Sequence, residues 1–193
     1  MLEKKIALFG GTFDPIHWGH LKMAKVAQKE LKLDKVIFIP NKKSPLKSQS
    51  PVSSAKDRLK MIELVLKDDP LFSVSDYEIN KFDNDYSYQT ALHFKKKFTQ
   101  SKLYWLLGAD QVDQLHLWVE IEKMSSIVYF VAGERNGSRN INQFLPINVK
   151  FLDFDSIQVS ASDLRKKIYN KQSFKAHIPE SVTKYIIKNE LYM

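Results

Sequence analysis

The segment GGTFDPIHWGH, residues 10–20, constrains this chain more than any other feature of the sequence. It directly follows an apolar run at residues 6–9, which predicts a buried strand. Two glycines and a hydroxyl at the strand end, followed by His17 and His20 at a helix start, present backbone amides and imidazoles to an anion. The segment therefore predicts a binding site for a nucleotide phosphate.

Each residue type in this segment suits that chemistry. Gly10 and Gly11 lack a Cβ atom, so the backbone can approach a ligand closely, and Thr12 adds a hydroxyl. His17 and His20 are three residues apart on the first helical turn, where both can donate to one phosphate. Neither has to be a general base, because nucleotidyl transfer depends mainly on positioning and on stabilising charge. A zinc site is disfavoured, because the chain has no cysteine and no H-E-x-x-H pattern.

Strand and helix patterns alternate along the chain. Such alternation predicts an α/β fold with a doubly wound parallel sheet, which binds its ligand at the carboxyl ends of the strands. The expected strands are residues 6–9, 36–39, 72–79, 103–107, 127–132 and 149–152. The expected helices are residues 18–31, 54–67, 89–98, 111–124, 160–169 and 179–191.

Length and composition limit the organisation and location of the protein. With 193 residues and 44% hydrophobic content, we expect residues 1–193 to form one domain, with a small helical C-terminal part from about residue 160. The absence of cysteine excludes disulfides and thiolate metal sites. No apolar N-terminal leader and no run of 18 apolar residues is present, so we expect a cytoplasmic protein without a membrane partner.

The formal net charge of +8 raises nucleic-acid binding as an alternative function. However, 30 residues are basic, and most of them are lysines spread along the chain, which favours a solvated lysine surface without a nucleic-acid partner. Where the background prefers lysine, an arginine is expected at a planar, bidentate contact with phosphate or carboxylate. The four arginines are Arg58, Arg135, Arg139 and Arg165.

The segment at residues 10–20 resembles the T/H-x-G-H signature of the nucleotidyltransferase superfamily, and its longer form is most similar to that of bacterial nicotinate-nucleotide adenylyltransferases. The resemblance extends through the chain to Arg165. It implies a Rossmann-like nucleotidyltransferase fold and transfer of the adenylyl group of ATP to nicotinate mononucleotide, a step of NAD biosynthesis. It also implies Mg²⁺ bound through the ATP phosphates, with no dedicated protein ligand apparent.

The resemblance also implies a set of residues that bind ATP. The segment VSASDLR, residues 159–165, is similar to the family's I-S-S-T-x-I-R, although Ala161 replaces the usual Ser and Ser162 the usual Thr. Hydroxyls and amides at this helix start can receive triphosphate oxygens, and Arg165 adds a charged fork. We expect His17, His20 and Arg165 to be catalytic, with His20 stabilising charge at the reacting phosphorus. The expected nucleotide-binding residues are Gly10, Gly11, Thr12, Phe13, Gly108, Asp110, Ser160, Ser162 and Arg165.

A second set of residues is implied for the mononucleotide. The loop after residue 39 resembles the family segment that holds its phosphate, although Leu46 stands where a His is usual. The helix start at residues 85–90 resembles a segment whose amides receive the pyridine carboxylate. Trp118, after the Gly-Ala-Asp of residues 108–110, offers a face for pyridine stacking, with core burial as the alternative. The expected mononucleotide-binding residues are Asn41, Lys47, Tyr86, Ser87, Trp118 and Arg135.

Three other functions stay open at this point. Phosphopantetheine adenylyltransferases share the first motif and the terminal Ser-rich helix start, but the Gly108 and Trp118 pattern favours the nicotinate enzyme. A basic nucleic-acid-binding protein and a regulatory module that binds nucleotide without turnover belong to different classes. The sequence leaves the choice between nicotinate and nicotinamide mononucleotide open, and likewise the oligomeric state.

Overall fold

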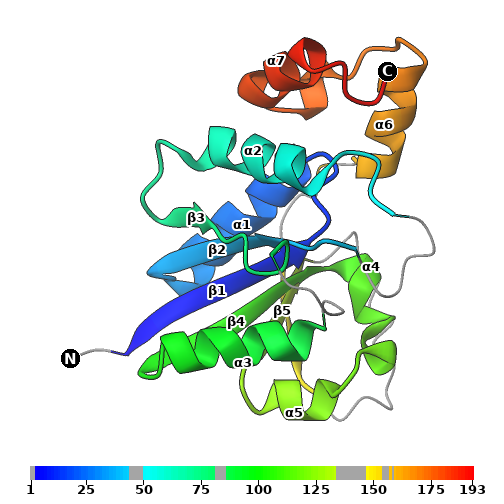
Figure 1. The fold of residues 1–193 in the computed structure, drawn as a ribbon. Coiled ribbons are helices and arrows are strands. Elements are labelled where there is room, and N and C mark those ends of the chain that lie inside the picture. Colours follow the sequence, from blue (N-terminus) through cyan, green and yellow to red (C-terminus); the bar gives the residue numbers. More distant parts are fainter. Residues whose placement is uncertain (1–2, 44–49, 81–85, 134–146, 154–156, 158) are drawn as a thin grey trace.

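A computed structural model describes residues 3–43, 50–80, 86–133, 147–153, 157 and 159–193. Within them the chain builds one six-stranded sheet in which every strand pairs parallel to its neighbours (Figure 1). The spatial order of the strands is β3-β2-β1-β4-β5-β6. Their bounds are β1 Lys4–Gly11, β2 Lys35–Pro40, β3 Phe72–Val74, β4 Ser101–Gly108, β5 Tyr129–Gly133 and β6 Val149–Leu152.

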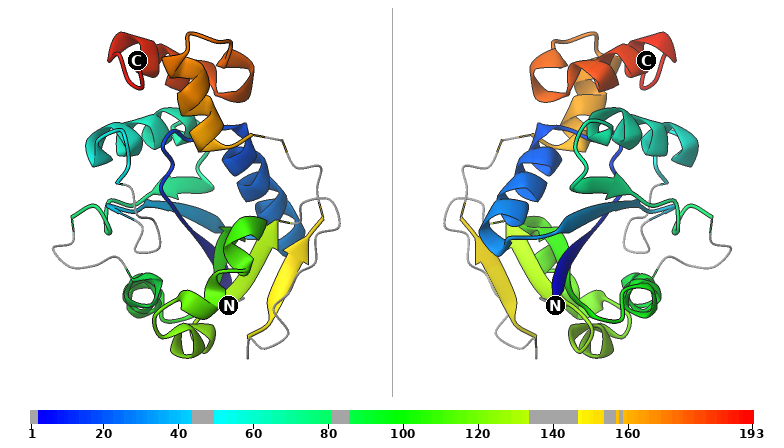
Figure 2. Two further views of the ribbon diagram at one scale, coloured as in Figure 1. Left: turned by 90° about the vertical axis from the view of Figure 1, so that its right-hand side faces the viewer. Right: turned by 90° about the vertical axis from the view of Figure 1, so that its left-hand side faces the viewer.

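Helices cover both faces of this sheet (Figure 2). On one face, the apolar residues of α1, α2, α6 and α7 share a core with Ala7 and Phe9 of β1. On the other, α3, α4 and α5 share a core with Ile6 and Leu8 of the same strand. This alternation arises because successive side chains of a strand point to opposite faces. The prediction of a doubly wound parallel α/β fold is therefore confirmed.

The helix bounds are α1 Trp18–Leu31, α2 Ala55–Leu66, α3 Ser87–Lys97, α4 Ala109–Val112, α5 Ile121–Ser125, α6 Ala161–Tyr169 and α7 Glu180–Lys188, with 3₁₀ turns η1 Leu115–Leu117 and η2 Lys175–His177.

The point where the strand order reverses lies between β1 and β4. These two central strands pair in register from Lys4 with Ser101 to Phe9 with Leu106, and both end in glycine. The chain leaves β1 for the helices of one face and leaves β4 for those of the other. In open α/β sheets this arrangement opens a crevice at the carboxyl strand ends, where ligands bind.

The last helices form a further layer above α2 (Figure 1). Helix α7 packs on α2, which itself covers the sheet. The hydroxyl of Tyr185 in α7 donates to Asp57 Oδ1 in α2 at 2.9 Å. The prediction of one domain with a small helical part from about residue 160 stays a prediction, although the described helices in that region agree with its helical content. No described helix is both long enough and apolar enough to span a membrane.

Two expected elements differ from the structure. Residues 111–124 are mainly helical, as expected, but the helical part is divided into α4, η1 and α5. Trp118 adopts an extended backbone and Glu120 a left-handed one with φ of 56°, and neither conformation continues a helix. Strand β3 is also shorter than the expected residues 72–79, because the chain turns after Val74, where the amide of Tyr77 donates to Ser75 Oγ at 3.3 Å.

Candidate functional site

The two histidines of the first motif come together at the start of α1. His17 occupies the N-cap position and is buried, whereas His20, one turn later, is partly exposed. Their rings stack with centroids 3.7 Å apart and planes inclined by 22°. His20 Nδ1 also accepts a hydrogen bond from the His17 amide at 3.3 Å. Both imidazoles thus stand at the positive end of the helix dipole, beside the carboxyl end of β1, as the sequence predicts.

Aromatic packing holds the His20 ring from the other side. Phe13 meets it edge-on at 5.0 Å between centroids, and Phe9 lies at 6.1 Å. Phe13 has a φ of 49° and a side chain that is only 2% exposed, in edge-on contact with Phe9. The ring of Phe13 therefore belongs to the core, and the expected role of this residue in nucleotide binding stays a prediction.

Aromatic neighbours also account for the two glycines that precede this turn. A Cβ atom built on Gly10 would lie 2.8 Å from Cζ2 of Trp105, and one on Gly11 would lie 2.9 Å from Cζ of Phe13. Both distances are too short for a real contact between carbon atoms. Packing against these aromatic rings therefore requires glycine at both positions, in addition to the close approach of a ligand that is expected there.

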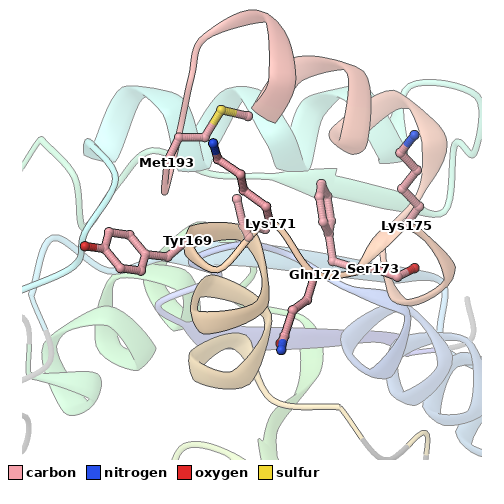
Figure 3. A pocket seen from close by; sticks show the side chains of 8 residues that line it. Tyr169, Lys171, Gln172, Ser173, Lys175 and Met193 are labelled. Carbon is pink, nitrogen blue, oxygen red and sulfur yellow. The ribbon is translucent and has the colours of Figure 1, made fainter.

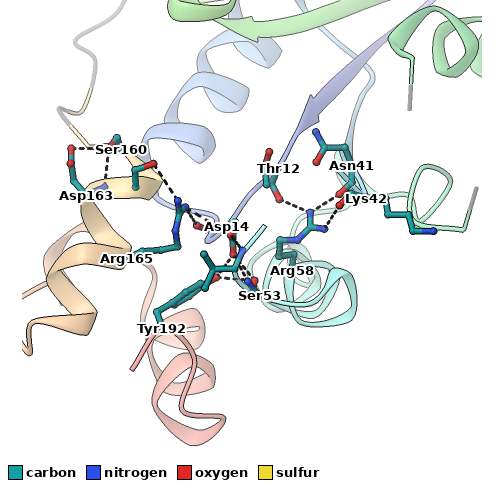
Figure 4. A network of polar contacts seen from close by, with 12 residues as sticks. Thr12, Asp14, Asn41, Lys42, Ser53, Arg58, Ser160, Asp163, Arg165 and Tyr192 are labelled. Carbon is teal, nitrogen blue, oxygen red and sulfur yellow. Dashed lines mark hydrogen bonds and ion pairs between the residues drawn. The ribbon is translucent and has the colours of Figure 1, made fainter. Parts of the chain in front are cut away.

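Arg58 of α2 ties the first two strand ends together. Its guanidinium is buried, and Nη1 donates to the carbonyls of Thr12 and Asn41, each at 2.7 Å. Nη2 donates to the carbonyl of Lys42 at 3.3 Å. Although the arginines are expected at phosphate or carboxylate contacts, Arg58 binds backbone carbonyls of the loops that follow β1 and β2 (Figure 4). Its three carbonyl partners include the predicted site residues Thr12 and Asn41.

The terminal motif reaches the first motif through Arg165. Ser160 is the N-cap of α6, and its Oγ accepts from the Asp163 amide at 3.0 Å. Arg165 Nη1 donates to the carbonyl of Asp14 at 2.7 Å, and Nη2 donates to Ser162 Oγ at 3.3 Å (Figure 4). The fold thereby joins two predicted segments that lie 151 residues apart.

A buried carboxylate that sequence analysis missed lies at the start of α3. Tyr86 caps this helix and Ser87 is its first residue, as expected for the third motif. Within the first turn, the hydroxyl of Thr90 donates to Oε1 of Glu78 at 2.7 Å, and both side chains are buried. A carboxylate there is favourable beside the positive helix end. Glu78 falls within the strand expected at residues 72–79, and the apolar pattern of that stretch does not indicate that an acidic side chain is buried there.

The remaining predicted residues divide between the second core and the undescribed parts of the chain. Gly108 ends β4, and Trp118 is half-buried with its ring edge-on to Trp105 and Phe130 at 6.2 and 6.5 Å. Trp118 thus packs in the core, which is the alternative to stacking on the pyridine ring. The stacking itself stays a prediction. Lys47, Arg135 and the side chain of Asp110 lie outside the described residues, as does Leu46.

A hollow of about 440 Å³ lies on the C-terminal part, away from these residues (Figure 3). Tyr169, Phe174 and Met193 are among its lining side chains. It adjoins the C-terminal end of α6, whereas Ser160 caps the opposite end. None of the predicted site residues lines it.

Comparison with known proteins assigns the chain to a family. The Cytidylyltransferase-like family model matches residues 8–167. A probable nicotinate-nucleotide adenylyltransferase of Bacillus cytotoxicus is 38% identical over 189 residues, which cover 98% of each chain. The chain belongs to the nicotinate-nucleotide adenylyltransferase family. A probable nicotinate-nucleotide adenylyltransferase of Clostridium tetani is 35% identical, and the aligned region covers 98% of this chain and 99% of the Clostridium protein.

Solved structures of nicotinate-nucleotide adenylyltransferases share the fold. A Plasmodium falciparum nicotinic acid mononucleotide adenylyltransferase complexed with NaAD has a TM-score of 0.81 at 21% identity, with 98% of each chain covered. A putative nicotinate-nucleotide adenylyltransferase of Vibrio parahaemolyticus has a TM-score of 0.70 at 15% identity. The superposition covers 95% of this chain and 99% of the Vibrio chain. The expected family and its Rossmann-like nucleotidyltransferase fold are therefore confirmed.

Proposed function

We propose that the protein transfers the adenylyl group of ATP to nicotinate mononucleotide, producing nicotinate adenine dinucleotide and pyrophosphate for NAD biosynthesis. The observation that carries this proposal is the near full-length similarity, at 32–38% identity, to proteins named for this activity. The Plasmodium falciparum neighbours, complexed with NaAD and with APC, also support it. The stacked His17 and His20 at the strand-order reversal give the reaction a chemically suitable location.

In this mechanism the phosphate of nicotinate mononucleotide attacks the α-phosphorus of ATP in line. A bond forms between the acceptor oxygen and the α-phosphorus. The bond between the α-phosphorus and the oxygen that bridges it to the β-phosphorus breaks, so that pyrophosphate leaves. The acceptor is already an anion, so the step needs no general base and no covalent enzyme intermediate. Catalysis then depends on positioning the reactants and on stabilising the charge that develops on oxygen.

The residues of the first and last motifs are suited to these tasks. His17 and His20 would donate to phosphate oxygens, with His20 acting at the reacting phosphorus. Ser160, Ser162 and Arg165 would hold the β- and γ-phosphates of the leaving group. A guanidinium has five N–H donors, and the two hydrogen bonds of Arg165 in the described structure use two of them. Gly10, Gly11, Thr12, Phe13, Gly108 and Asp110 would complete the ATP site.

The second substrate would bind between the β2 loop and the start of α3. Asn41 and Lys47 would hold its phosphate, Tyr86 and Ser87 would present the helix start to the pyridine carboxylate, and Trp118 and Arg135 would contact the nucleotide. The hydrogen bond from the Asn41 amide to the Gly11 carbonyl, at 3.0 Å, supports a mononucleotide site next to the ATP site, because it keeps the start of the β2 loop beside the end of β1.

We assign Mg²⁺ to the phosphate oxygens of ATP, where a divalent cation neutralises charge on the triphosphate. The described residues contain no group of three His, Asp or Glu side chains that could hold a metal ion, and the proposal assigns no protein ligand to it. A cytoplasmic location and the absence of a nucleic-acid partner stay predictions.

The decisive test is a set of parallel incubations with ATP and Mg²⁺. Separate tubes receive nicotinate mononucleotide, nicotinamide mononucleotide or phosphopantetheine, and pyrophosphate and the adenylylated product are measured. We expect turnover with the nicotinate substrate. Turnover with phosphopantetheine alone would replace the acceptor, and no turnover in any tube, with ATP binding retained in calorimetry, would favour a regulatory module. Salt-dependent retention on RNA or DNA would favour the nucleic-acid-binding alternative.

A further inference from the structure

The carboxylate of Asp14 is the centre of a buried polar network just before the catalytic histidines. Asp14 is 2% exposed. Its Oδ2 accepts from the Val52 amide at 2.8 Å, and its Oδ1 accepts from the amide of Ser53 at 3.2 Å and from the Ser53 hydroxyl (Figure 4). A carboxylate buried without such donors would be strongly destabilising. The loop between β1 and α1 is therefore bonded through one side chain to the residues that precede α2.

The fourth donor to this carboxylate comes from the far end of the chain. The hydroxyl of Tyr192, the penultimate residue, donates to Asp14 Oδ1 at 2.7 Å and lies 3.0 Å from Ser53 Oγ. Tyr192 is 8% exposed and belongs to the core that α1, α2, α6 and α7 share. Burial, reinforced by the negative charge of Asp14, raises the pKa of Tyr192 above its usual value, so the hydroxyl keeps its proton at neutral pH.

Arg165 approaches the same residue from a third direction. Its Nη1 donates to the Asp14 carbonyl at 2.7 Å and lies 3.8 Å from Oδ2. Asp14 thus connects a residue of the proposed triphosphate site with the C-terminal residues of the chain. Only Pro15 and Ile16 separate it from His17, the N-cap of α1. A shift of Asp14 would be passed to both imidazoles along this short, buried segment.

We propose that Tyr192 is a positioning residue for the adenylyl transfer, acting through Asp14 on His17 at the end of the loop and on His20 in the first turn of α1. Tyr192 is linked to the proposed catalytic Arg165 through the Asp14 carboxylate, which both side chains approach and to which Ser53 also donates. Small displacements of catalytic groups cost turnover steeply, since about 1 Å can lower the rate by 10²-fold. The expected effect on turnover rests on the proposed function. The expected effect on the positions of the histidines rests only on the hydrogen bonds.

The test compares two tyrosine-to-phenylalanine variants of the same C-terminal region. Tyr192→Phe removes the hydroxyl on Asp14 and keeps the buried ring. Tyr185→Phe is the matched control, because it removes a tyrosine–carboxylate hydrogen bond of 2.9 Å that joins α7 to α2 through Asp57 and leaves Asp14 intact. We expect Tyr192→Phe to lower kcat about 10-fold with KM for both substrates changed less than about 2-fold, because the loss is confined to transition-state positioning. Tyr185→Phe should keep kcat within about 2-fold of the wild type.

A second readout does not depend on turnover. The imidazole ¹H–¹⁵N signals of His17 and His20 should shift in Tyr192→Phe and stay in place in Tyr185→Phe, with the exposed His116 as internal reference. Equal kcat values in the two variants, or unmoved His17 and His20 signals in Tyr192→Phe, would overturn the proposal. A wild-type protein that is inactive with nicotinate mononucleotide would overturn the proposed function instead, while the imidazole signals would still decide the role of Tyr192.

Discussion

Replacing Arg58 with methionine should destabilise the protein through the loss of three hydrogen bonds at the strand ends. The guanidinium donates to the carbonyls of Thr12, Asn41 and Lys42, and the side chain is 1% exposed. Methionine keeps much of the apolar stem, so the substitution chiefly removes the donors. The three acceptors remain in place at Thr12, Asn41 and Lys42, where no helix or strand holds the backbone.

The size of the effect follows from the surroundings of these acceptors. Each bond lies in a part-buried position, where water replaces a lost donor incompletely, so we take about 1 kcal/mol for each lost bond. The free energy of unfolding should then fall by about 3 kcal/mol. For a domain of this size, each kcal/mol lowers Tm by about 2–4 °C, so Tm should fall by about 6–12 °C.

Differential scanning calorimetry of Arg58→Met, with Lys60→Met as control, measures this change. Lys60 lies on the same helix, and its side chain is 53% exposed and paired with Glu63 at 3.1 Å. Exposed pairs contribute about 1 kcal/mol at most, so the control should change Tm by less than about 4 °C. A Tm decrease in Arg58→Met no larger than that in the control would refute the view that this arginine holds the two loops together.

Three further predictions concern the site and its supports. His20→Ala should lower kcat by roughly 10²-fold, as expected for a lost donor at the reacting phosphorus; a folded variant within a few-fold of the wild type in the pyrophosphate assay contradicts the role given to His20. Gly10→Ala should destabilise the fold by about 1–3 kcal/mol, because its Cβ would lie 2.8 Å from the buried Trp105 ring; an unchanged midpoint of urea unfolding excludes this clash. Because the pKa of Tyr192 is raised in the folded state above its usual 10.0, the unfolded state loses this proton first, and stability should fall as pH rises above about 10, by up to about 1.4 kcal/mol per pH unit. Urea unfolding at pH 9 and pH 11 should show this loss in the wild type and a smaller one in Tyr192→Phe, and equal losses in the two proteins would refute it.

The fold could be predicted from the sequence largely because its strands are short apolar runs separated by helical patterns. Strand β6 and helix α1 have the expected bounds, and most other elements differ from expectation by one or two residues at an end. The division of the helical stretch at residues 111–124 has a local cause. The apolar residues there do pack into the core, as Val112, Leu115 and Met124 do, but the backbone reaches them through an extended and a left-handed residue. Apolar spacing alone therefore does not distinguish a continuous helix from short helical turns that cover the same surface.

The site shows a different limit of sequence-based prediction. The sequence motif predicts that His17 and His20 lie together, because their positions depend on one helical turn. The residues that hold that turn in place come from elsewhere: Arg58 follows Thr12 by 46 residues, and Tyr192 follows Asp14 by 178. A buried arginine that binds carbonyls and a tyrosine that binds a carboxylate have no characteristic local spacing, since their partners are set by the packing of α2 and α7. The sequence motifs of this chain therefore indicate the residues proposed to contact the phosphates. They do not indicate Arg58 and Tyr192, whose contacts hold the loop before those residues. The comparison of Tyr192→Phe with Tyr185→Phe measures how much that positioning contributes to turnover.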